Sequence, residues 1–419
     1  MKSSKYKREY TLTQHTPLLH FQGGQRGVTL RASEVKPQLD RFLHNFIEKM
    51  MLKVPQSWYI ARESKYVHSF AYKMSVSSKT TQQVSKGKGS TVRQLYFADK
   101  SGTEALFFKS TCADGREFYG VHLTLVCFCE EMCLLEDANI PGLPGNVTLL
   151  DLIDFVLPAF FALHCFGTRA TKGFGSFTLD DRPIDESYLR IFVPVYYSLA
   201  YKKENPCYTD VLTIIWIISG MMKSGFNFPH LNPPKYYKGR IFDYFIKKGI
   251  GSDKAFIKQK VLQGKDNNVN SEENARYSGF RFSRAMLGLP QEYQFRGGPK
   301  TSRCGKVKVK RVEGKNKIER FASPVRFIPN GQALFIVPTP IPDEMFGASF
   351  LFDKEQISTP SKDEFNLVQY LDWFMDELMD AVKNNGEKTI PSFDCVLKTL
   401  DTSFKNIRHP AKDRGPAHA

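Results

Sequence analysis

The sequence predicts an α+β protein built from two ferredoxin-like (RRM-like) units in tandem. In residues 1–183, the segments with strand and helix periodicity follow the order strand, helix, strands, helix, strand. A similar but less regular order returns in residues 184–402. The length of 419 residues, 42% of them hydrophobic, is enough to bury more than one core.

The first unit is expected to begin with a strand at residues 16–22, after a basic leader. A helix follows, because apolar residues recur at spacings of three and four from Leu39 to Met50. Ser33 is the expected N-cap, and Pro37 is expected in the first turn, where amide hydrogens have few intrahelical partners. The remaining expected elements are strands at 66–75, 94–98, 105–110 and 117–129, a helix at 149–164 and a final strand at 177–179.

The second unit carries a helical, basic insertion at residues 233–274, to which no particular role is assigned. Around it we expect a strand at 188–201, a helix at 209–222, strands at 306–312, 320–328 and 333–337, an amphipathic helix at 365–382 and a last strand at 392–397. Residues 403–419 are then a tail.

The charge balance points to an anionic partner. Lys and Arg number 59 against 43 Asp and Glu, which gives a net charge of +16. A membrane is not the expected partner, because the apolar stretch at 147–165 contains two aspartates and a proline, and the one at 211–222 is too short to span a bilayer. The first residues lack a secretory signal, so we expect a cytoplasmic protein.

Neither a metal nor another cofactor is expected. The eight cysteines form no C-x-x-C pair, and the alternating run at 121–129 places Cys127 and Cys129 on the core side of a strand as unpaired thiols. The motifs of P-loop enzymes, zinc proteases and α/β-hydrolases are missing from the sequence.

A glycine-rich segment follows the second expected helix. Gly173 and Gly175 permit positive φ angles and the close approach of a phosphate or another backbone, while Arg169 and Lys172 supply positive charge. By itself such a segment is typical of a tight turn. Its place between the last helix and last strand of a ferredoxin-like unit gives it more weight.

This loop, the TPL sequence at Thr16–Leu18, the GVTLRA segment at Gly27–Ala32 and the tandem units resemble the repeat-associated mysterious protein (RAMP) superfamily of CRISPR effector complexes. Within it, RAMLGLPQEYQF (residues 284–295) and ERFASPVRF (residues 319–327) resemble the two-domain, first-numbered RAMP subunit of the type III-B (Cmr) module. The second unit departs from the pattern, because residues 384–388 hold a single glycine where a glycine-rich loop is expected.

The resemblance implies a non-catalytic subunit of an RNA-guided antiviral ribonucleoprotein complex. Such a subunit binds the 3′ region of guide RNA, takes part in recognising target RNA and contacts other RAMP subunits. The expected RNA-binding residues of the first unit are Arg26, Arg31, Arg169, Lys172, Gly173 and Gly175.

Two basic regions of the second unit are further RNA candidates. Lys306, Lys308 and Lys310 alternate along an expected strand and could follow successive phosphates, but a solvated edge strand explains them equally well. In the insertion, Lys235, Lys238 and Arg240 stand next to tyrosines that could stack on unpaired bases. The neighbouring aromatic residues are better explained as the inner face of a helix.

An alternative function is metal-independent cleavage of guide-RNA precursors. His15, His20 and His44 lie near the first strand and helix, and a histidine could remove the 2′-hydroxyl proton. No second acid–base residue can be paired with any of them from the sequence. We therefore expect a binding protein and not an enzyme.

Overall fold

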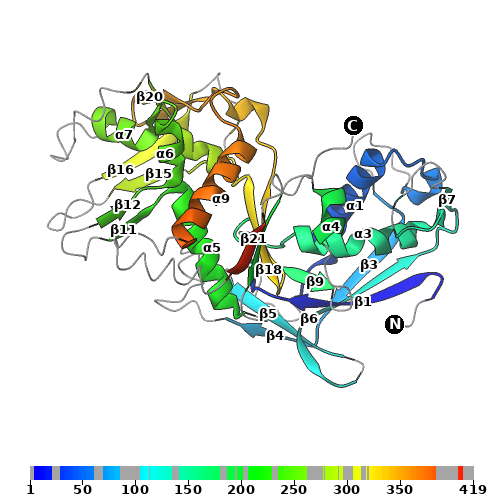
Figure 1. The fold of residues 1–419 in the computed structure, drawn as a ribbon. Helices are drawn as coiled ribbons and strands as arrows, with labels where there is room; N and C mark the ends of the chain where they lie inside the picture. Colours follow the sequence, from blue (N-terminus) through cyan, green and yellow to red (C-terminus); the bar gives the residue numbers. More distant parts are fainter. Residues whose placement is uncertain are drawn as a thin grey trace. The chain divides into compact units, whose positions relative to one another are not determined.

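The chain divides into two compact units in a computed structural model (Figure 1). The first unit comprises Met1–Tyr196, Glu204–Leu212 and Phe327–Phe335, and the second comprises Tyr197–Lys203, Thr213–Arg326 and Ile336–Ala419. Two later segments thus join the first unit, so no single boundary near residue 183 separates the units. The structure describes residues 4–20, 29–60, 69–84, 104–112, 114–134, 140, 142–179, 186–193, 196–201, 206–228, 235–261, 277, 279–290, 292–295, 305–312, 318, 320–383 and 404–408.

The sheet of the first unit is organised around β1 (Lys7–Gln14). This strand pairs antiparallel with β6 (Glu117–Cys127) on one side and β9 (Phe177–Leu179) on the other, and β3 (Tyr72–Ser77) pairs with the far side of β6. The sheet continues through β5 (Glu104–Thr111), which pairs with β6, β2 (Leu18–His20) and β4 (Thr80–Gln83).

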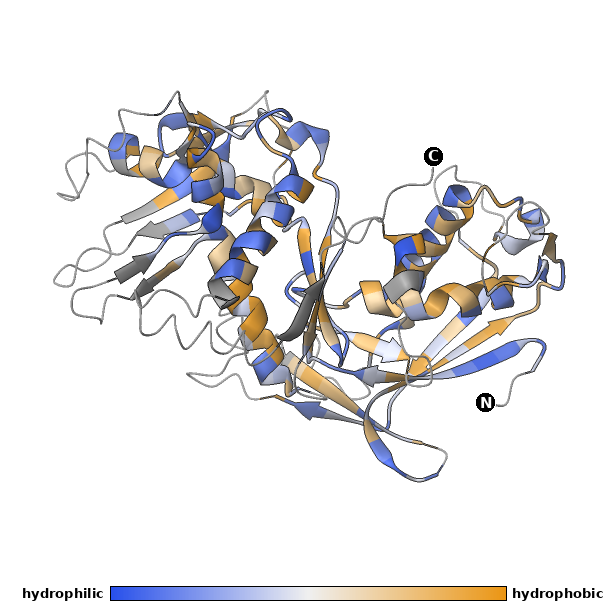
Figure 2. Cartoon of the chain, in the orientation of Figure 1, coloured by the Kyte–Doolittle hydropathy of each residue, from blue (hydrophilic) through white to orange (hydrophobic). Residues whose placement is uncertain are grey.

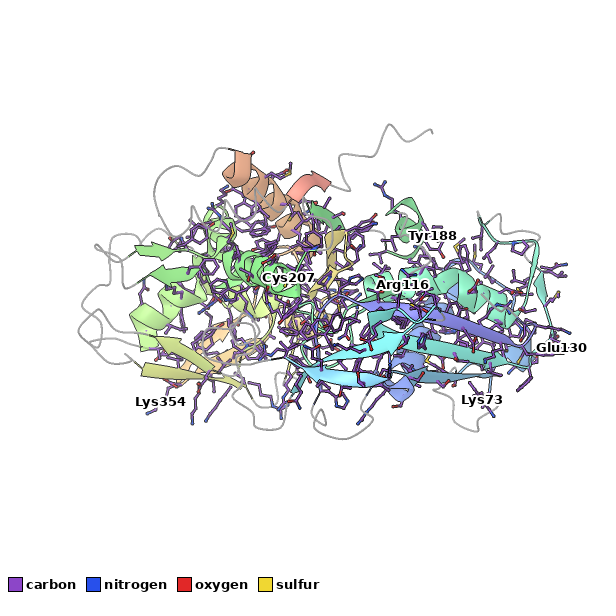
Figure 3. The ribbon with its side chains drawn as sticks, turned by 90° about the horizontal axis from the view of Figure 1, so that it is seen from below. Lys73, Arg116, Glu130, Tyr188, Cys207 and Lys354 are labelled. Carbon is purple, nitrogen blue, oxygen red and sulfur yellow. The ribbon has the colours of Figure 1, made fainter. Side chains whose placement is uncertain are left out.

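Helices cover one face of this sheet. The helices α1 (Ala32–Lys49) and α3 (Leu149–Leu163) lie over it in Figure 1. Figure 2 shows α3 as strongly hydrophobic, which agrees with the burial of most of its side chains. On β6, Val121, Leu123 and Leu125 alternate towards the helices and are fully buried. Figure 3 shows the opposite face with Lys73 labelled. On this face Phe107 of β5 packs against Tyr208, the first residue of a later helix.

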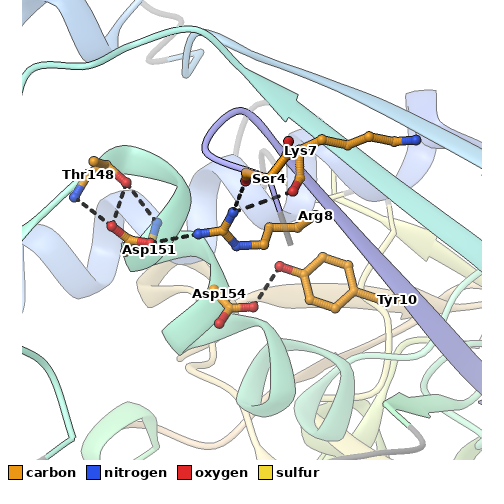
Figure 4. Close-up of polar contacts among 7 residues, drawn as sticks. All are labelled: Ser4, Lys7, Arg8, Tyr10, Thr148, Asp151 and Asp154. Atoms are coloured by element: carbon orange, nitrogen blue, oxygen red, sulfur yellow. Dashed lines mark hydrogen bonds and ion pairs between the residues drawn. The ribbon is translucent and has the colours of Figure 1, made fainter. Parts of the chain in front are cut away.

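Polar contacts fasten β1 to α3 (Figure 4). Arg8 Nη2 lies 3.0 Å from Asp151 Oδ1, and the Tyr10 hydroxyl donates to Asp154 Oδ1 at 2.7 Å. Asp151 also closes a capping box, because the Thr148 side chain accepts from the Asp151 amide while the Asp151 carboxylate accepts from the Thr148 amide. The same carboxylate therefore caps the helix and holds the strand.

The described residues form two further sheets of four strands each. One has the order β17 (Val325–Pro329), β18 (Ala333–Pro338), β10 (Tyr197–Tyr201) and β21 (Phe404–Arg408). The other has the order β15 (Glu292–Phe295), β16 (Gly305–Arg311), β19 (Ser349–Phe352) and β20 (Glu355–Ser358), and packs on a core that includes Val307, Phe350 and Phe352. The main helices are α5 (Tyr208–Lys223), α6 (Arg240–Ile246) and α9 (Leu367–Lys383).

The remaining elements are short. They are η1 (Gln56–Trp58), β7 (Cys133–Leu134), β8 (Asn146–Val147), α4 (Glu186–Phe192), β11 (Phe226–Phe228), β12 (Lys235–Tyr237), β13 (Gly251–Ser252), α7 (Asp253–Phe256), η2 (Ile257–Val261), β14 (Phe280–Arg281), η3 (Ser283–Leu287) and η4 (Asp343–Met345).

The predicted α+β class is confirmed, with corrections to single elements. The prediction of a basic leader before the first strand is wrong, because these residues form the central strand β1. Residues 186–192 form helix α4 and not the start of a strand, since Tyr188 and Phe192, one helical turn apart, both pack on Phe155. The expected tail contains β21, which pairs with β10. The strands predicted at 94–98 and 392–397 lie outside the described residues.

The start of the first helix also differs from the prediction. Arg31 occupies the N-cap with no side-chain capping bond, so Ser33 lies within the first turn and Pro37 lies two positions further into the helix than expected. Six cysteines in the described part of the chain are free thiols, as the sequence predicts for unpaired residues. Among the described residues, no helix is long and apolar enough to cross a bilayer.

Replacing Thr148 with Ala should destabilise the first unit. The substitution removes the side-chain acceptor of the Asp151 amide, which typically lowers the free energy of unfolding by about 1 kcal/mol. Denaturant unfolding followed by circular dichroism measures this loss. The same change at Thr80, an exposed residue of β4, serves as the control. Equal stabilities for the two variants would contradict the capping role.

Candidate nucleic-acid interface

The loop between α3 and β9, residues 164–176, is the candidate site that the sequence singles out. Gly167, Gly173 and Gly175 have φ angles of +78°, +79° and +69°. A Cβ atom on Gly175 would lie 2.1 Å from the carbonyl oxygen of Phe166, so only glycine fits there. The glycines allow the loop to fold back tightly on itself.

The TPL segment before β2 is the surface on which this loop rests. The Gly175 amide donates to the Pro17 carbonyl at 3.0 Å, and the Thr16 hydroxyl donates to the Gly173 carbonyl at 2.6 Å. The Ser176 amide in turn donates to the Thr16 hydroxyl oxygen at 3.1 Å. The two sequence motifs of the first unit therefore form one hydrogen-bonded structure.

The start of α1 belongs to the same site. The Glu34 carboxylate in its first turn accepts a hydrogen bond from the Gly167 amide at 2.6 Å. Arg31, exposed at the N-cap, stands one turn before Glu34. Burial and, secondly, the charge of Arg31 lower the pKa of His20, the last residue of β2. The sequence analysis gave no role to Glu34, because nothing local indicates that it binds a distant loop.

Two cations lie on the loop itself. Burial and then the neighbouring charge of Arg169 lower the pKa of Lys172 to about 8. The Lys172 ammonium lies 5.7 Å from the centre of the Phe327 ring. Arg169 has a φ angle of +61°, which is uncommon for a residue with a side chain, and its carbonyl accepts the Lys172 amide at 2.8 Å.

The segment Phe327–Phe335 supports the other side of the loop. The Phe327 amide donates to the Thr171 carbonyl at 3.2 Å, and Lys172 and Phe327 form a parallel bridge. The Ser176 hydroxyl donates to the Pro329 carbonyl. The loop thus lies between β2 and a segment that is distant in the sequence.

His15 closes the contact between this segment and the sheet. Its Nε2 atom lies 2.7 Å from the Thr178 hydroxyl oxygen, and its ring packs against Gly331. Burial lowers the pKa of His15 to about 4, so the ring is neutral at neutral pH.

The glycines shape the loop but do not offer amides to a ligand. Gly173 and Gly175 are buried, and their amides donate to the carbonyls of Ala170 and Pro17. The suggested close approach of a phosphate to these backbones therefore does not fit the geometry. The chemistry available to an anion at this site comes from the side chains of Arg31, Arg169 and Lys172.

The cations of the insertion are engaged in ion pairs. Lys238 lies 3.2 Å from Asp243, and Arg240 lies 3.4 Å from the same carboxylate and 3.8 Å from Glu377. Lys247 lies 3.3 Å from Glu377. The aromatic residues of α6 are buried, as the alternative reading of this segment predicts. Lys235 lies in β12.

The lysines of β16 differ from the cations of the insertion in their surroundings. β16 lies inside its sheet, between β15 and β19, so the alternative of an edge strand is wrong. Lys308 and Lys310 are exposed, whereas Val307 between Lys306 and Lys308 is fully buried. Neither Lys308 nor Lys310 forms an ion pair with a residue that the structure describes. Lys306 pairs in register with Gln294 of β15.

Other predicted site residues are not brought to the loop. His44 lies 3.2 Å from Glu48 on α1, and Arg26 lies outside the described residues. In the described ranges no group of three His, Cys, Asp or Glu side chains is arranged to hold a metal ion.

Comparison with known proteins identifies both halves of the chain. A model described as the Cmr1 N-terminal domain matches residues 5–226, and one described as the Cmr1 C-terminal domain matches residues 236–406. No curated protein matches the sequence. A solved chain from the type III-B Cmr-β complex, bound to cognate target RNA and AMPPnP in the presence of ssDNA, is 11% identical and has a TM-score of 0.35. That match covers 95% of this chain and 99% of the solved one.

Protonation of His15 should weaken the first unit in acid. Because the pKa is about 4 in the folded chain and near 6.5 when unfolded, stability is complete above pH 6.5 and declines as the pH falls towards 4. The decline can reach about 3 kcal/mol. Denaturant unfolding of the wild type and of His15→Gln at pH 7 and pH 4.5 measures it. A decline of the same size in His15→Gln would contradict this assignment.

Proposed function

The chain belongs to the Cmr1 family, and we propose that it is a cytoplasmic, RNA-binding subunit of a type III-B CRISPR effector complex that performs no catalysis itself. The family assignment confirms the resemblance to the RAMP superfamily. Its expected partners are guide RNA, contacted in the 3′ region, target RNA and other RAMP subunits. The observation that carries the proposal is the loop at residues 164–176, which is held from two sides and carries Arg169 and Lys172 close enough for their charges to interact.

We infer that the first unit is ferredoxin-like. In support, its strands run β9–β1–β6–β3 with every neighbouring pair antiparallel, and the two helices α1 and α3 cover one face. In this plan the loop before the last strand meets the start of the first helix. That meeting point is where Glu34 binds Gly167.

The proposed contact with RNA is electrostatic. Arg31, Arg169 and Lys172 would bind phosphate groups, and the N-terminal end of α1 adds a partial positive charge. Gly173 and Gly175 act by keeping the loop closed, since their amides are already bonded. A site built from side-chain charges binds backbone phosphates and reads no base sequence, which suits a subunit that must accept guides of any sequence.

A second contact is proposed on β16. Lys308 and Lys310 are exposed and project from the interior strand of a sheet whose other face is buried. Lys238 and Arg240 are less suitable, because their charges are paired with Asp243. A cation already held by a carboxylate must give up that pair before it binds phosphate.

We propose that the chain does not cleave RNA because of where its histidines lie. His15 is largely buried, with Nε2 bonded to Thr178 and the ring packed on Gly331, so it is poorly placed to reach an RNA 2′-hydroxyl. His44 faces Glu48 on the exposed side of α1. RNA cleavage in EDTA by the purified chain, abolished by His20→Ala, would favour the endoribonuclease alternative instead.

Neutralising the loop should weaken RNA binding and its dependence on salt. The triple variant Arg31→Gln, Arg169→Gln, Lys172→Gln removes three phosphate contacts, each worth about 0.7 in the slope of log K against log salt, so the slope should fall by about 2. At about 0.1 M salt we expect a tenfold to hundredfold loss of affinity. Fluorescence anisotropy with a single-stranded RNA at several salt concentrations measures both.

The matched control removes three cations that already form ion pairs. Lys238→Gln, Lys247→Gln, Lys362→Gln changes the net charge by the same amount, and its slope should stay near that of the wild type. The pH gives a further readout, because Lys172 loses its charge above about pH 8. The effect of Lys172→Gln should therefore shrink between pH 7 and pH 9. Equal slopes for the two triple variants would contradict the loop assignment.

Neutralising the β16 row tests the second contact. Lys308→Gln, Lys310→Gln should lower the salt slope by about 1.4 at unchanged thermal stability, because both side chains are exposed. The control for this pair is Lys247→Gln, Lys362→Gln. An unchanged slope would restrict the RNA contact to the first unit.

A further inference from the structure

An exposed tyrosine lies on the face of the first sheet that points away from α1 and α3. Leu106 and Phe108 of β5 belong to the core under the helices. Side chains alternate along a strand, so Phe107 and Lys109 lie on the opposite face. Tyr119 of β6 stands directly opposite Lys109 in the register, and its side chain is 45% exposed. Tyr119 therefore shares this face with Phe107 and Lys109.

The ring of Tyr119 lies across β5 instead of projecting into solvent. Its hydroxyl donates to Gln82 Oε1 at 3.0 Å, and Gln82 belongs to β4, the strand on the far side of β5. Strands two apart in a sheet are about 10 Å from each other, so the side chain must cross β5 to form this bond. Phe107 supports the ring at 5.4 Å between centroids, and Tyr208 packs on Phe107 at 5.2 Å. The ring is thus held in place on its inner side and exposed on its outer side.

The charged groups around this tyrosine leave one cation without a carboxylate. The Lys109 ammonium lies 5.4 Å from the centre of the tyrosine ring and forms no ion pair with a residue that the structure describes. Lys79 lies 3.6 Å from Glu117, and Arg116 lies 2.7 Å from Asp114, so these charges compensate each other. The exposed ring therefore has a positive charge beside it, on a chain whose net charge is +16.

This arrangement suits an unpaired base better than a protein surface or a duplex. The neighbours Gln82 and Glu117 are polar and exposed, whereas a protein interface buries a contiguous apolar centre. A base needs one ring face on which to stack, and the phosphate next to it needs one cation. In a duplex the bases already stack on one another, so only an unpaired base can stack on Tyr119.

The ring lies on the same sheet as the strand that supports the loop at residues 164–176. Leu106, three residues before Lys109 on β5, pairs with Leu18 of β2. The Thr168 amide of the loop donates to the carbonyl of Leu19, the next residue of β2, at 3.0 Å. Three strand residues span about 10 Å, so one RNA strand can extend from the loop to the ring.

We propose that Tyr119 and Lys109 form a stacking site for an unpaired base of RNA. The base lies on the tyrosine ring, and Lys109 binds the adjoining phosphate. This rests on the proposed function of the chain as an RNA-binding subunit and adds the class of RNA that it takes. The cations of the loop bind phosphates of any RNA, whereas a stacking site requires a single strand.

Fluorescence anisotropy with a single-stranded RNA tests the site. Tyr119→Ala should lower the affinity about fivefold to a hundredfold, because the stacking of one base is lost. The salt slope should stay the same, since no charge is removed. Tyr119→Phe keeps the ring and should bind like the wild type. The matched control is Phe128→Ala, which removes an exposed aromatic ring just after β6 and should also bind like the wild type.

A duplex of the same sequence separates stacking from folding. Tyr119→Ala and the wild type should bind the duplex equally, because its bases offer no free face. Equal affinities of the two chains for the single strand would overturn the stacking site, and so would an equal loss for both RNAs. If the wild-type chain binds neither RNA, the proposed function itself fails.

Crosslinking of the wild-type chain gives a readout that needs no variant. A single-stranded RNA that carries iodouridine is irradiated in the complex, which joins the modified base to an aromatic side chain stacked on it. We expect mass spectrometry to find the adduct on Tyr119 and none on Phe128. Adducts at other residues only, or no adduct, would reject the site.

Discussion

The backbone contact between Phe327 and Thr171 is the constraint on which the site depends. It holds the loop from the side opposite β2, so that every turn of the loop is fixed between two surfaces. Glycine is needed at 175 because the loop folds back on Phe166 with no room for a side chain. The amides of Gly173 and Gly175 already donate to protein carbonyls, so the side chains of Arg169 and Lys172 are the groups that can meet a ligand, and they lie close enough for their charges to interact.

Net charge alone does not locate a binding surface, because many cations of this chain are already paired. In α6 and its surroundings the positive charges face Asp243 and Glu377, where they stabilise the packing of the helix. In β16 neither Lys308 nor Lys310 forms an ion pair with a described residue, although Glu292 of β15 lies opposite Lys308 in the sheet. The two basic regions look equally suitable for RNA in the sequence. The structure distinguishes them by whether acidic residues form ion pairs with their cations.

Sequence patterns predicted the elements whose signal is local. The helix expected at 149–164 is α3, and β9 lies at its predicted residues, because apolar periodicity and capping residues act within a few positions. β1 escaped detection because its outward-facing residues are all polar and its inner face begins with Arg8 and ends with Gln14, so only Tyr10 and Leu12 reveal the buried face. The support of the loop by Phe327 and the bond from Glu34 could not be predicted, because both depend on pairing between segments distant in the sequence.

The two ends of helix α1 have different surroundings in the first unit. Its N-terminal end has no side-chain cap, carries Arg31 and binds the glycine loop through the Glu34 carboxylate. Its C-terminal end closes with Met51 in a left-handed conformation, between the exposed Lys49 and Lys53. Because a helix of 18 residues is a rigid spacer, it holds the contact between Glu34 and Gly167 at one end about 27 Å from Met51 at the other.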